Sequence, residues 1–225
     1  MDNHYKLVTI EDLKSDEIIC KYVVRANEYL AVLGFTDHGM RHVELVSQIS
    51  ANVMRRLWRS DREVQMAGIA GFLHDIGNVC GRDHHEQSGA LLCREMLARH
   101  SMPDEEIMEI MLAIGNHEER TGTPINAVGS ALILGDKTDV HRSRVQNRDR
   151  KTFDIHDKVN YAVTKSFLDV ENDTKQIILR LTIDTSEAEV MQYFELFMDR
   201  MLMNKRAAEF LGCHFTLEIN GMKMF

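Results

Sequence analysis

The sequence predicts a mainly α-helical protein with a small C-terminal α+β appendage, and three observations indicate this fold class. Only two of the 225 residues are proline, a residue that interrupts helices. Apolar residues recur with a helical period through about the first 140 residues. Beyond about residue 158 the pattern changes to strand, strand, helix and strand. We therefore expect a helical domain over residues 1–158 and an α+β appendage over residues 159–225.

Six helices follow one another in the predicted helical body. Their bounds come from the apolar periodicity and from residues that typically begin or end helices. Four of the expected helices cover residues 16–33, 84–100, 104–117 and 125–140. The second helix runs from a cap at Thr36 or Asp37 to about Trp58. The third runs from a cap at Ser60 or Asp61 to Ile76, where Gly77 is expected to end it.

The composition changes after the helical body. Residues 141–151 are basic, and we expect a loop or an exposed helix end there. Strands are then expected over 167–171 and 176–184, joined by a turn at 172–174. A long helix from Ser186 to about Leu211 and a strand over 214–220 complete the appendage, so that one helix covers a three-stranded sheet.

Composition and charge exclude several classes of protein. No apolar run approaches the roughly 20 residues that a membrane-spanning helix needs. The first residues lack the pattern of a secretory signal, and four scattered cysteines do not indicate a disulfide framework, so we expect a cytoplasmic protein. The net charge of −8 makes nucleic acid an unlikely partner, although a local basic patch stays open.

Histidines and acids at the ends or on the faces of the predicted helices form a candidate metal site. The set is His42, His74, Asp75, His85, His117 and Asp136. Imidazole and carboxylate together suit Fe, Mn, Zn, Co or Ni better than Mg or Ca alone. Six such groups can hold two metals, with Asp75 as the bridge because a carboxylate has two oxygens.

Two metals would suit the hydrolysis of a phosphate ester or anhydride. They make a metal-bound hydroxide accessible near neutral pH and neutralise charge on the phosphate oxygens. His74 and Asp75 are the expected catalytic centre of this site. We find no Ser/His/Asp or Cys/His arrangement in the sequence that competes with this interpretation.

Local motifs around these residues resemble a known family. The motifs are GFLHDIG at 71–77, HEQSGA at 85–90, NHEERTGTP at 116–124 and LGDK at 134–137. In this order they are similar to the HD superfamily of metal-dependent phosphohydrolases, over roughly residues 20–140. The resemblance is closest to small stand-alone members, including those that act on nucleotides.

The resemblance implies an HD-type helical bundle, one or two divalent transition metals, and a small phosphorylated substrate for which a nucleotide is favoured. Within the predicted set, His42, His74, Asp75 and Asp136 would hold the first metal. His85 and His117 would complete a second site that Asp75 bridges. His84 is adjacent to His85, but the offset to the following Gly-Ala pair favours His85 as the ligand.

Three positions depart from the family pattern. Asn78 stands where a lysine is expected, which removes one phosphate contact. Asn116 replaces the first histidine of a His-His pair, so one metal site would lack a ligand. Ile125 follows the Gly-Thr-Pro stretch where the GYP branch continues differently, which argues against a cyclic-di-GMP phosphodiesterase.

Several polar residues near the predicted ligands are candidate substrate contacts. They are Lys137, Arg142, Arg144, Arg82, Asn78 and His38. Guanidinium groups match the geometry of phosphate oxygens, but a solvated basic loop explains residues 137–144 equally well. His38 lies one turn before His42 on the same helix face, where an ordinary surface role is slightly favoured.

Two other functions stay open at this point. Some HD proteins use the same six ligands around two irons as oxygenases, and nothing in the residues excludes this chemistry. A non-catalytic regulator is a third alternative, in which the appendage binds a partner, although the retained ligand set counts against it. The sequence also leaves a homodimer open.

Overall fold

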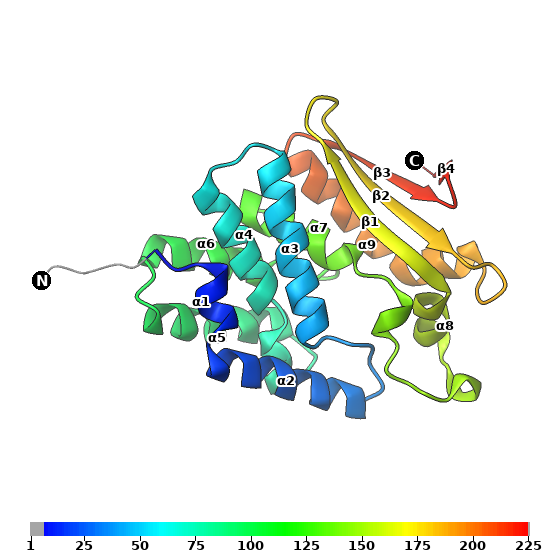
Figure 1. Cartoon of the computed structure of the whole chain (residues 1–225), viewed down its shortest axis with the longest axis horizontal. Helices are drawn as coiled ribbons and strands as arrows, with labels where there is room; N and C mark the ends of the chain where they lie inside the picture. Colours follow the sequence, from blue (N-terminus) through cyan, green and yellow to red (C-terminus); the bar gives the residue numbers. More distant parts are fainter. Residues whose placement is uncertain (1–6, 225) are drawn as a thin grey trace, which may run out of the picture.

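The computed structural model describes residues 7–224, and their fold is mainly helical with a C-terminal sheet, as predicted (Figure 1). A 3-10 helix over Ile76–Cys80 links two of the helices. The elements in chain order are α1 Ile10–Lys14, α2 Glu17–Val32, α3 Met40–Arg56, α4 Asp61–Leu73, α5 His85–Arg99, α6 Asp104–Gly115, α7 Ala127–Thr138, α8 Ile155–Ala162, β1 Val163–Glu171, β2 Gln176–Ile183, α9 Val190–Phe210, β3 His214–Ile219 and β4 Met222–Lys223.

Capping residues explain where the helices of the body begin. Ser60 caps α4 as predicted, and its side chain and that of Glu63 exchange the two hydrogen bonds of a capping box. The predicted cap of α3 at Thr36 or Asp37 is wrong, because the helix begins at Met40 after Gly39. The Asp37 carboxylate instead accepts hydrogen bonds from the Gly39 N–H and from Arg41, both at 2.9 Å.

Helix α4 ends at Leu73, three residues before the predicted end at Ile76. His74 is its C-cap, and the chain continues through Asp75 into the 3-10 helix. Gly77 lies within that 3-10 helix, so it does not act as a simple helix stop. A Cβ at Gly77 would overlap the His85 carbonyl oxygen and the Gly89 nitrogen, so glycine lets α5 approach this turn closely.

The C-terminal sheet has four strands in the order β1-β2-β3-β4, one more than predicted. β1 and β2 form the predicted hairpin, and β3 returns parallel to β2 after α9. The short β4 pairs antiparallel with the end of β3. Helix α9 begins at Val190 and not at Ser186, because the Ser186 N–H and hydroxyl are both bonded to the Asp184 carboxylate in a turn.

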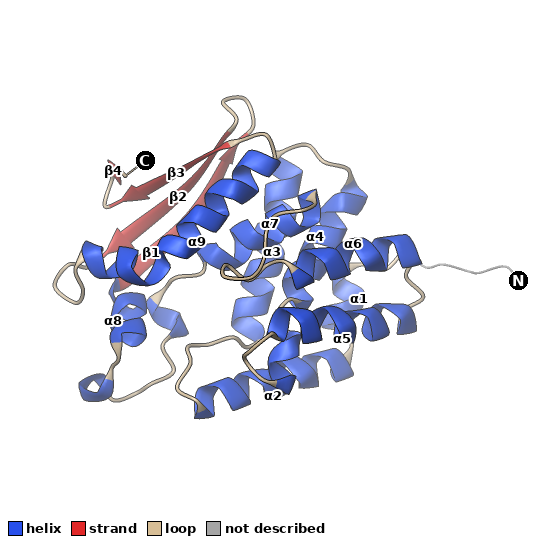
Figure 2. Cartoon of the chain, turned by 180° about the vertical axis from the view of Figure 1, so that it is seen from behind, coloured by secondary structure: helices blue, strands red, loops and turns tan. Residues whose placement is uncertain are grey.

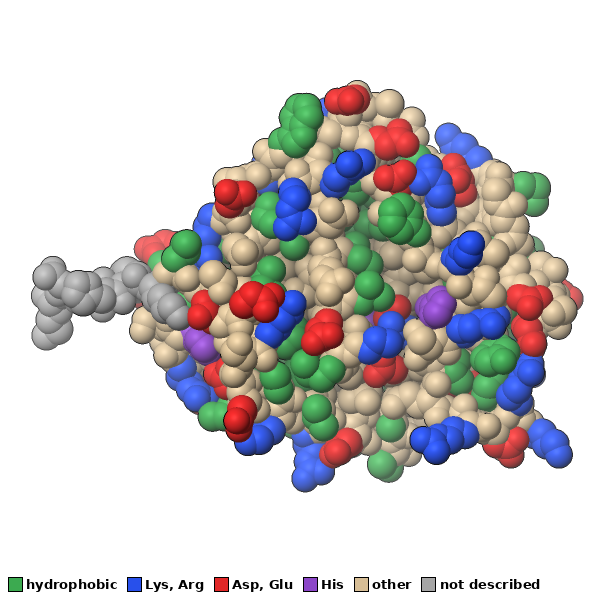
Figure 3. Space-filling model, viewed as in Figure 1, with side chains coloured by type: hydrophobic (Ala, Val, Ile, Leu, Met, Phe, Trp, Pro, Cys, Tyr) green, Lys and Arg blue, Asp and Glu red, His purple; other side chains and the backbone are tan. Residues whose placement is uncertain are grey.

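The basic segment after α7 is more ordered than a plain loop. It contains two short 3-10 helices, over Arg142–Arg144 and Arg150–Thr152, and α8 follows them without having been predicted. Arg144 is buried, with 2% of its surface exposed, so the expectation of an exposed segment is wrong at this residue. On the face shown in Figure 3, acidic and basic side chains are interspersed.

The apolar core joins the helical body to the sheet. Helix α9 packs between α7 and the sheet (Figure 2). One cluster of buried side chains contains Met54 of α3, Leu134 of α7, Leu179 of β2 and Met201 of α9. The predicted boundary at residues 158 and 159 lies within α8. Among residues 7–224, no helix is both long and apolar enough to cross a membrane.

Candidate metal centre

All six predicted metal ligands meet at the centre of the helical body. His42 lies in the first turn of α3, and Asp136 in the last turn of α7. His74 and Asp75 follow α4, His85 begins α5, and His117 comes two residues after α6. All six are buried, with at most 8% of their surface exposed.

The four histidines turn the same ring nitrogen toward one another. The Nε2 atoms of His42 and His74 are 3.3 Å apart, and so are those of His85 and His117. The two pairs adjoin through the His74 and His117 rings, whose centroids are 5.1 Å apart. The imidazoles therefore form one continuous group and not two separate pairs.

The other ring nitrogen of each histidine faces a fixed hydrogen-bond acceptor. His42 Nδ1 lies 2.7 Å from Asp139 Oδ2, and His74 Nδ1 lies 2.9 Å from the Gly71 carbonyl oxygen. His85 and His117 contact the carbonyl oxygens of Arg82 and Ile114 through Nδ1, at 3.1 and 2.6 Å. These acceptors favour a proton on Nδ1, which leaves the Nε2 lone pairs directed into the centre.

The carboxylates of Asp75 and Asp136 complete the set of candidate ligand groups. Asp75 Oδ2 lies 3.5 Å from His42 Nε2 and 3.4 Å from His74 Nε2, while Asp75 Oδ1 lies 3.4 Å from His85 Nε2. Asp75 thus faces both histidine pairs, each through a different oxygen. Asp136 Oδ1 lies 3.4 Å from His42 Nε2 and 3.7 Å from His74 Nε2.

The arrangement of these ligand atoms suits a bound metal ion better than it suits hydrogen bonds among the side chains themselves. Asp75 Oδ2 is buried and accepts no hydrogen bond from any residue in the described part of the chain. A buried carboxylate oxygen without a donor is costly, and a cation would offset that cost. Two triads have their ligand atoms close enough to share an ion, namely His42, His74 and Asp136, and His74, Asp75 and His117.

Charge and burial act strongly on the acid–base groups of this centre. Burial alone would raise the pKa of Asp75, but His74 holds it well below its usual value. Burial alone would lower the pKa of His74, but Asp75 and Asp136 raise it to about 10. The pKa values of His85 and His117 are lowered by burial. Without a metal, the centre therefore keeps a second ring proton on His74, so that an imidazolium is the cation beside the two ionised carboxylates.

Sequence reasoning missed the residues that hold these ligands in place. Asp139 follows α7 directly, three residues after Asp136, and contacts His42, Arg41 and Arg144. Its spacing from Asp136 is the signal that could have identified it.

A second group is an ion-pair chain that reaches the C-terminal appendage, in which Asp136 and Lys137 were predicted site residues and Glu119 and Arg200 were missed. Lys137 Nζ lies 2.8 Å from Asp136 Oδ2 and 2.5 Å from Glu119 Oε2. Glu119 Oε1 in turn accepts from Arg200 Nε of α9 at 3.2 Å. The sequence does not reveal these ion pairs, because residues such as Glu119 and Arg200 are far apart along the polypeptide.

The predicted substrate contacts lie in different surroundings. Arg82 and Asn78 adjoin the ligands, and Asn78 Nδ2 donates to Asp75 Oδ1 at 2.9 Å. His38 is buried beside His42, with ring centroids 5.5 Å apart, and its Nδ1 contacts the Thr36 carbonyl oxygen. Its predicted surface placement is therefore wrong.

The two arginines of the basic segment have partners away from the ligands. Arg144 donates to the carbonyl oxygens of Asp37 and Asp139. The Arg142 guanidinium lies over the Tyr161 ring, 5.0 Å from its centroid. Asn116 does not act as a ligand either. Its Nδ2 donates to the Leu112 carbonyl oxygen and so caps α6.

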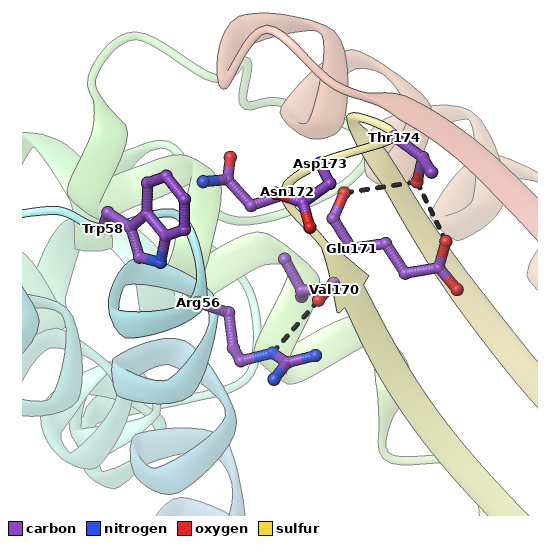
Figure 4. A pocket seen from close by; sticks show the side chains of 7 residues that line it. All are labelled: Arg56, Trp58, Val170, Glu171, Asn172, Asp173 and Thr174. Atoms are coloured by element: carbon purple, nitrogen blue, oxygen red, sulfur yellow. Dashed lines mark hydrogen bonds between the residues drawn. The ribbon is translucent and has the colours of Figure 1, made fainter.

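A surface depression of about 330 Å³ lies apart from this centre, beside the β1–β2 turn (Figure 4). Among its lining residues, Arg56 Nε donates to the Val170 carbonyl oxygen at 3.1 Å. None of the predicted site residues lines it. Its lining residues are Arg56, Trp58, Val170, Glu171, Asn172, Asp173 and Thr174.

Comparison with known proteins gives one family. The model of the HD domain matches residues 39–192, which is more than half of the chain. An uncharacterized protein of Methanocaldococcus jannaschii is 25% identical over 193 residues, covering 75% of this chain and 73% of its own. A crystal structure of a predicted HD superfamily hydrolase from an uncultured Thermotogales bacterium is 26% identical, with a TM-score of 0.43, covering 55% of this chain and 67% of its own.

Proposed function

This chain belongs to the HD-domain family, and from that premise we propose that it is a metal-dependent phosphohydrolase that acts on a phosphate ester or anhydride. The observation that carries the proposal is the convergence of four histidine Nε2 atoms around the two oxygens of Asp75. Each histidine has its Nδ1 on a fixed acceptor, so the donors are preorganised and need no rearrangement to bind an ion.

The proposed cofactor is one or two divalent transition metals, held by His42, His74 and Asp136 on one side and by Asp75, His85 and His117 on the other. When bound, such ions lower the pKa of a water molecule and neutralise charge on a phosphate group. Asp75 faces both histidine pairs, so it suits the position between two ions. Asp139 and Lys137 hold His42 and Asp136 in orientation.

A nucleotide is the substrate class that we propose, on the resemblance to stand-alone members that act on nucleotides. Arg82, a partly exposed cation that adjoins the ligand cluster, is consistent with a phosphorylated substrate. The ligand cluster contains no serine, threonine or cysteine side chain, which supports hydrolysis without a covalent intermediate on such a nucleophile. We further propose that the protein works in the cytoplasm.

Metal analysis followed by an activity panel tests the proposal. Protein purified without chelators should contain a divalent transition metal and should hydrolyse at least one phosphate ester or anhydride in a panel that includes nucleotides. Asp75→Ala should lose both the metal and the activity. Asp83→Ala removes an exposed carboxylate from the neighbouring loop and should keep both.

The alternative functions give different results in the same experiment. A di-iron centre that consumes oxygen, in protein without phosphatase activity across the panel, would support the oxygenase alternative and overturn the hydrolase. Activity that survives Asp75→Ala would place the reaction elsewhere on the chain. A chain that binds no metal would favour the regulatory alternative.

A further inference from the structure

The cations around the metal centre differ in how far their charge is already neutralised. Lys137 is buried and lies within 2.8 Å of two carboxylates, those of Asp136 and Glu119. Arg41 pairs with Asp37 and Asp139 at 2.9 and 2.8 Å. A cation held between carboxylates at these distances has little capacity left to bind a substrate phosphate.

Arg82 is the exception among the cations that adjoin the ligands. Its nearest carboxylate oxygens, on Glu118 and Asp75, lie at 3.6 and 3.8 Å, which is longer than a hydrogen bond. Its side chain is 26% exposed, whereas that of Lys137 is 3% exposed. Arg82 is therefore both accessible to a ligand and only weakly paired.

The position of the Arg82 guanidinium is set by its neighbours. Nη1 donates to Asn78 Oδ1 at 3.3 Å and lies 3.4 Å from His85 Nε2. The guanidinium also lies over the Phe35 ring, 5.9 Å from its centroid. His85 Nε2 is itself a candidate metal ligand, so in the loaded protein that contact would be given up. One N–H of Nη1 would then be free to donate elsewhere, while the other keeps its bond to Asn78.

Asn78 connects this guanidinium to the centre of the site. Its Oδ1 accepts from Arg82, and its Nδ2 donates to Asp75 Oδ1 at 2.9 Å. Asn78 is the residue that stands where the family pattern has a lysine. The Asn78 side chain is neutral, but its Oδ1 accepts a hydrogen bond from the charged guanidinium of Arg82, four residues further along the chain.

We propose that Arg82 is the phosphate-binding residue of this site, because it is accessible, only weakly paired with carboxylates and placed beside the candidate ligands. The proposal rests on the proposed phosphohydrolase function, which it deepens by naming the group that recognises the substrate phosphate. Arg82 binds the phosphate oxygens through its guanidinium fork, at the accessible rim of the ligand cluster. Asn78 acts as a positioning residue for it.

Binding of inorganic phosphate to the metal-loaded protein tests this assignment without relying on turnover. Titration calorimetry should give a dissociation constant about tenfold to a hundredfold weaker for Arg82→Gln, the factor expected when a hydrogen bond between charged groups is lost. Arg82→Lys keeps the charge and should lose less affinity. Arg94→Gln removes an exposed arginine of α5 and should bind phosphate as the wild type does.

Metal content and melting temperature of each variant separate binding from folding. The metal content should be unchanged in Arg82→Gln, because Arg82 is not a candidate ligand, and a melting temperature close to that of the wild type shows that the variant is folded. Phosphate affinity in Arg82→Gln equal to that of the wild type overturns the assignment, and so does a wild type that binds no phosphate.

The two proposals fail in different ways. Phosphate binding that depends on Arg82, in a wild type that hydrolyses no ester of the panel, supports the Arg82 assignment and overturns the proposed hydrolysis. Hydrolysis by the wild type that Arg82→Gln leaves unchanged in KM overturns the Arg82 assignment and leaves the phosphohydrolase function standing.

Discussion

His42 Nδ1 lies 2.7 Å from Asp139 Oδ2, and this contact links a candidate metal ligand to a carboxylate just outside the ligand set. Asp139 is almost fully buried and also pairs with Arg41 at 2.8 Å. Burial alone would raise the pKa of Asp139, but Arg144 and His42 hold it well below its usual value. The ionised carboxylate therefore orients the His42 ring and keeps its Nε2 lone pair directed at the centre.

The first prediction concerns this carboxylate. Asp139→Asn should weaken metal binding by about tenfold to a hundredfold, because a neutral amide orients His42 less firmly and makes it a poorer donor. Competition with a chelator measures the change. Asp37→Asn is the matched control, since Asp37 pairs with the same Arg41 and does not contact His42. Equal affinities in the two variants would contradict the role of Asp139.

The second prediction concerns the number of metal ions. His117→Gln should reduce the metal content from two ions per chain to one, because it removes the triad of His74, Asp75 and His117 and leaves that of His42, His74 and Asp136. Elemental analysis of the purified protein gives the count. His84→Gln, a change at the exposed neighbour of His85, should leave two. One ion in the wild type would show that a single site is occupied.

The third prediction concerns pH and the metal-free protein. The pKa of His74 is raised to about 10, and the ordinary pKa of a histidine in an unfolded chain is about 6.5. The stability from the His74 proton is therefore complete below about pH 6.5 and is lost as the pH rises toward 10. Urea unfolding should show this decline in the wild type, and His74→Gln should be less sensitive to pH over the same interval.

The same proton should oppose metal binding. Because a metal replaces it on His74, loading at pH 8 should release a proton to the buffer. Calorimetry in two buffers of different ionisation enthalpy measures that release. An absence of proton release at this pH would contradict the raised pKa of His74.

The fourth prediction concerns the crossing of α3 and α4, which sets the distance between His42 and His74. A Cβ at Gly71 would lie 2.8 Å from both the Cα and the nitrogen of Ser47, which are backbone atoms that cannot move aside alone. Gly71→Ala should therefore lower the free energy of unfolding by about 1–3 kcal/mol. At Gly115 the new Cβ would lie 3.8 Å from that of Ala90, an ordinary contact, so Gly115→Ala should be tolerated. Equal stability of the two variants would contradict the close crossing.

Local signals in the sequence were sufficient for most helix positions. Ser60 was one of the two expected caps of α4 and the structure confirms it, because capping involves only neighbouring residues. The start of α3 was predicted wrongly, since Asp37 is held by Arg41 and by the Gly39 N–H, and not by a helix that begins directly after it. The fourth strand was missed because β4 has only two residues, too few for a period-two pattern.

The sequence by itself determined the helical body, the sheet that follows it and the six residues that could bind metal, because helical periodicity and short motifs are local properties of the chain. Only the tertiary structure decided that all six side chains converge with their Nε2 and carboxylate atoms facing inward. Only it distinguished Arg82 from the other nearby cations, because whether a charge is free depends on partners such as Glu119, Arg200 and Asp139, which come from distant parts of the chain.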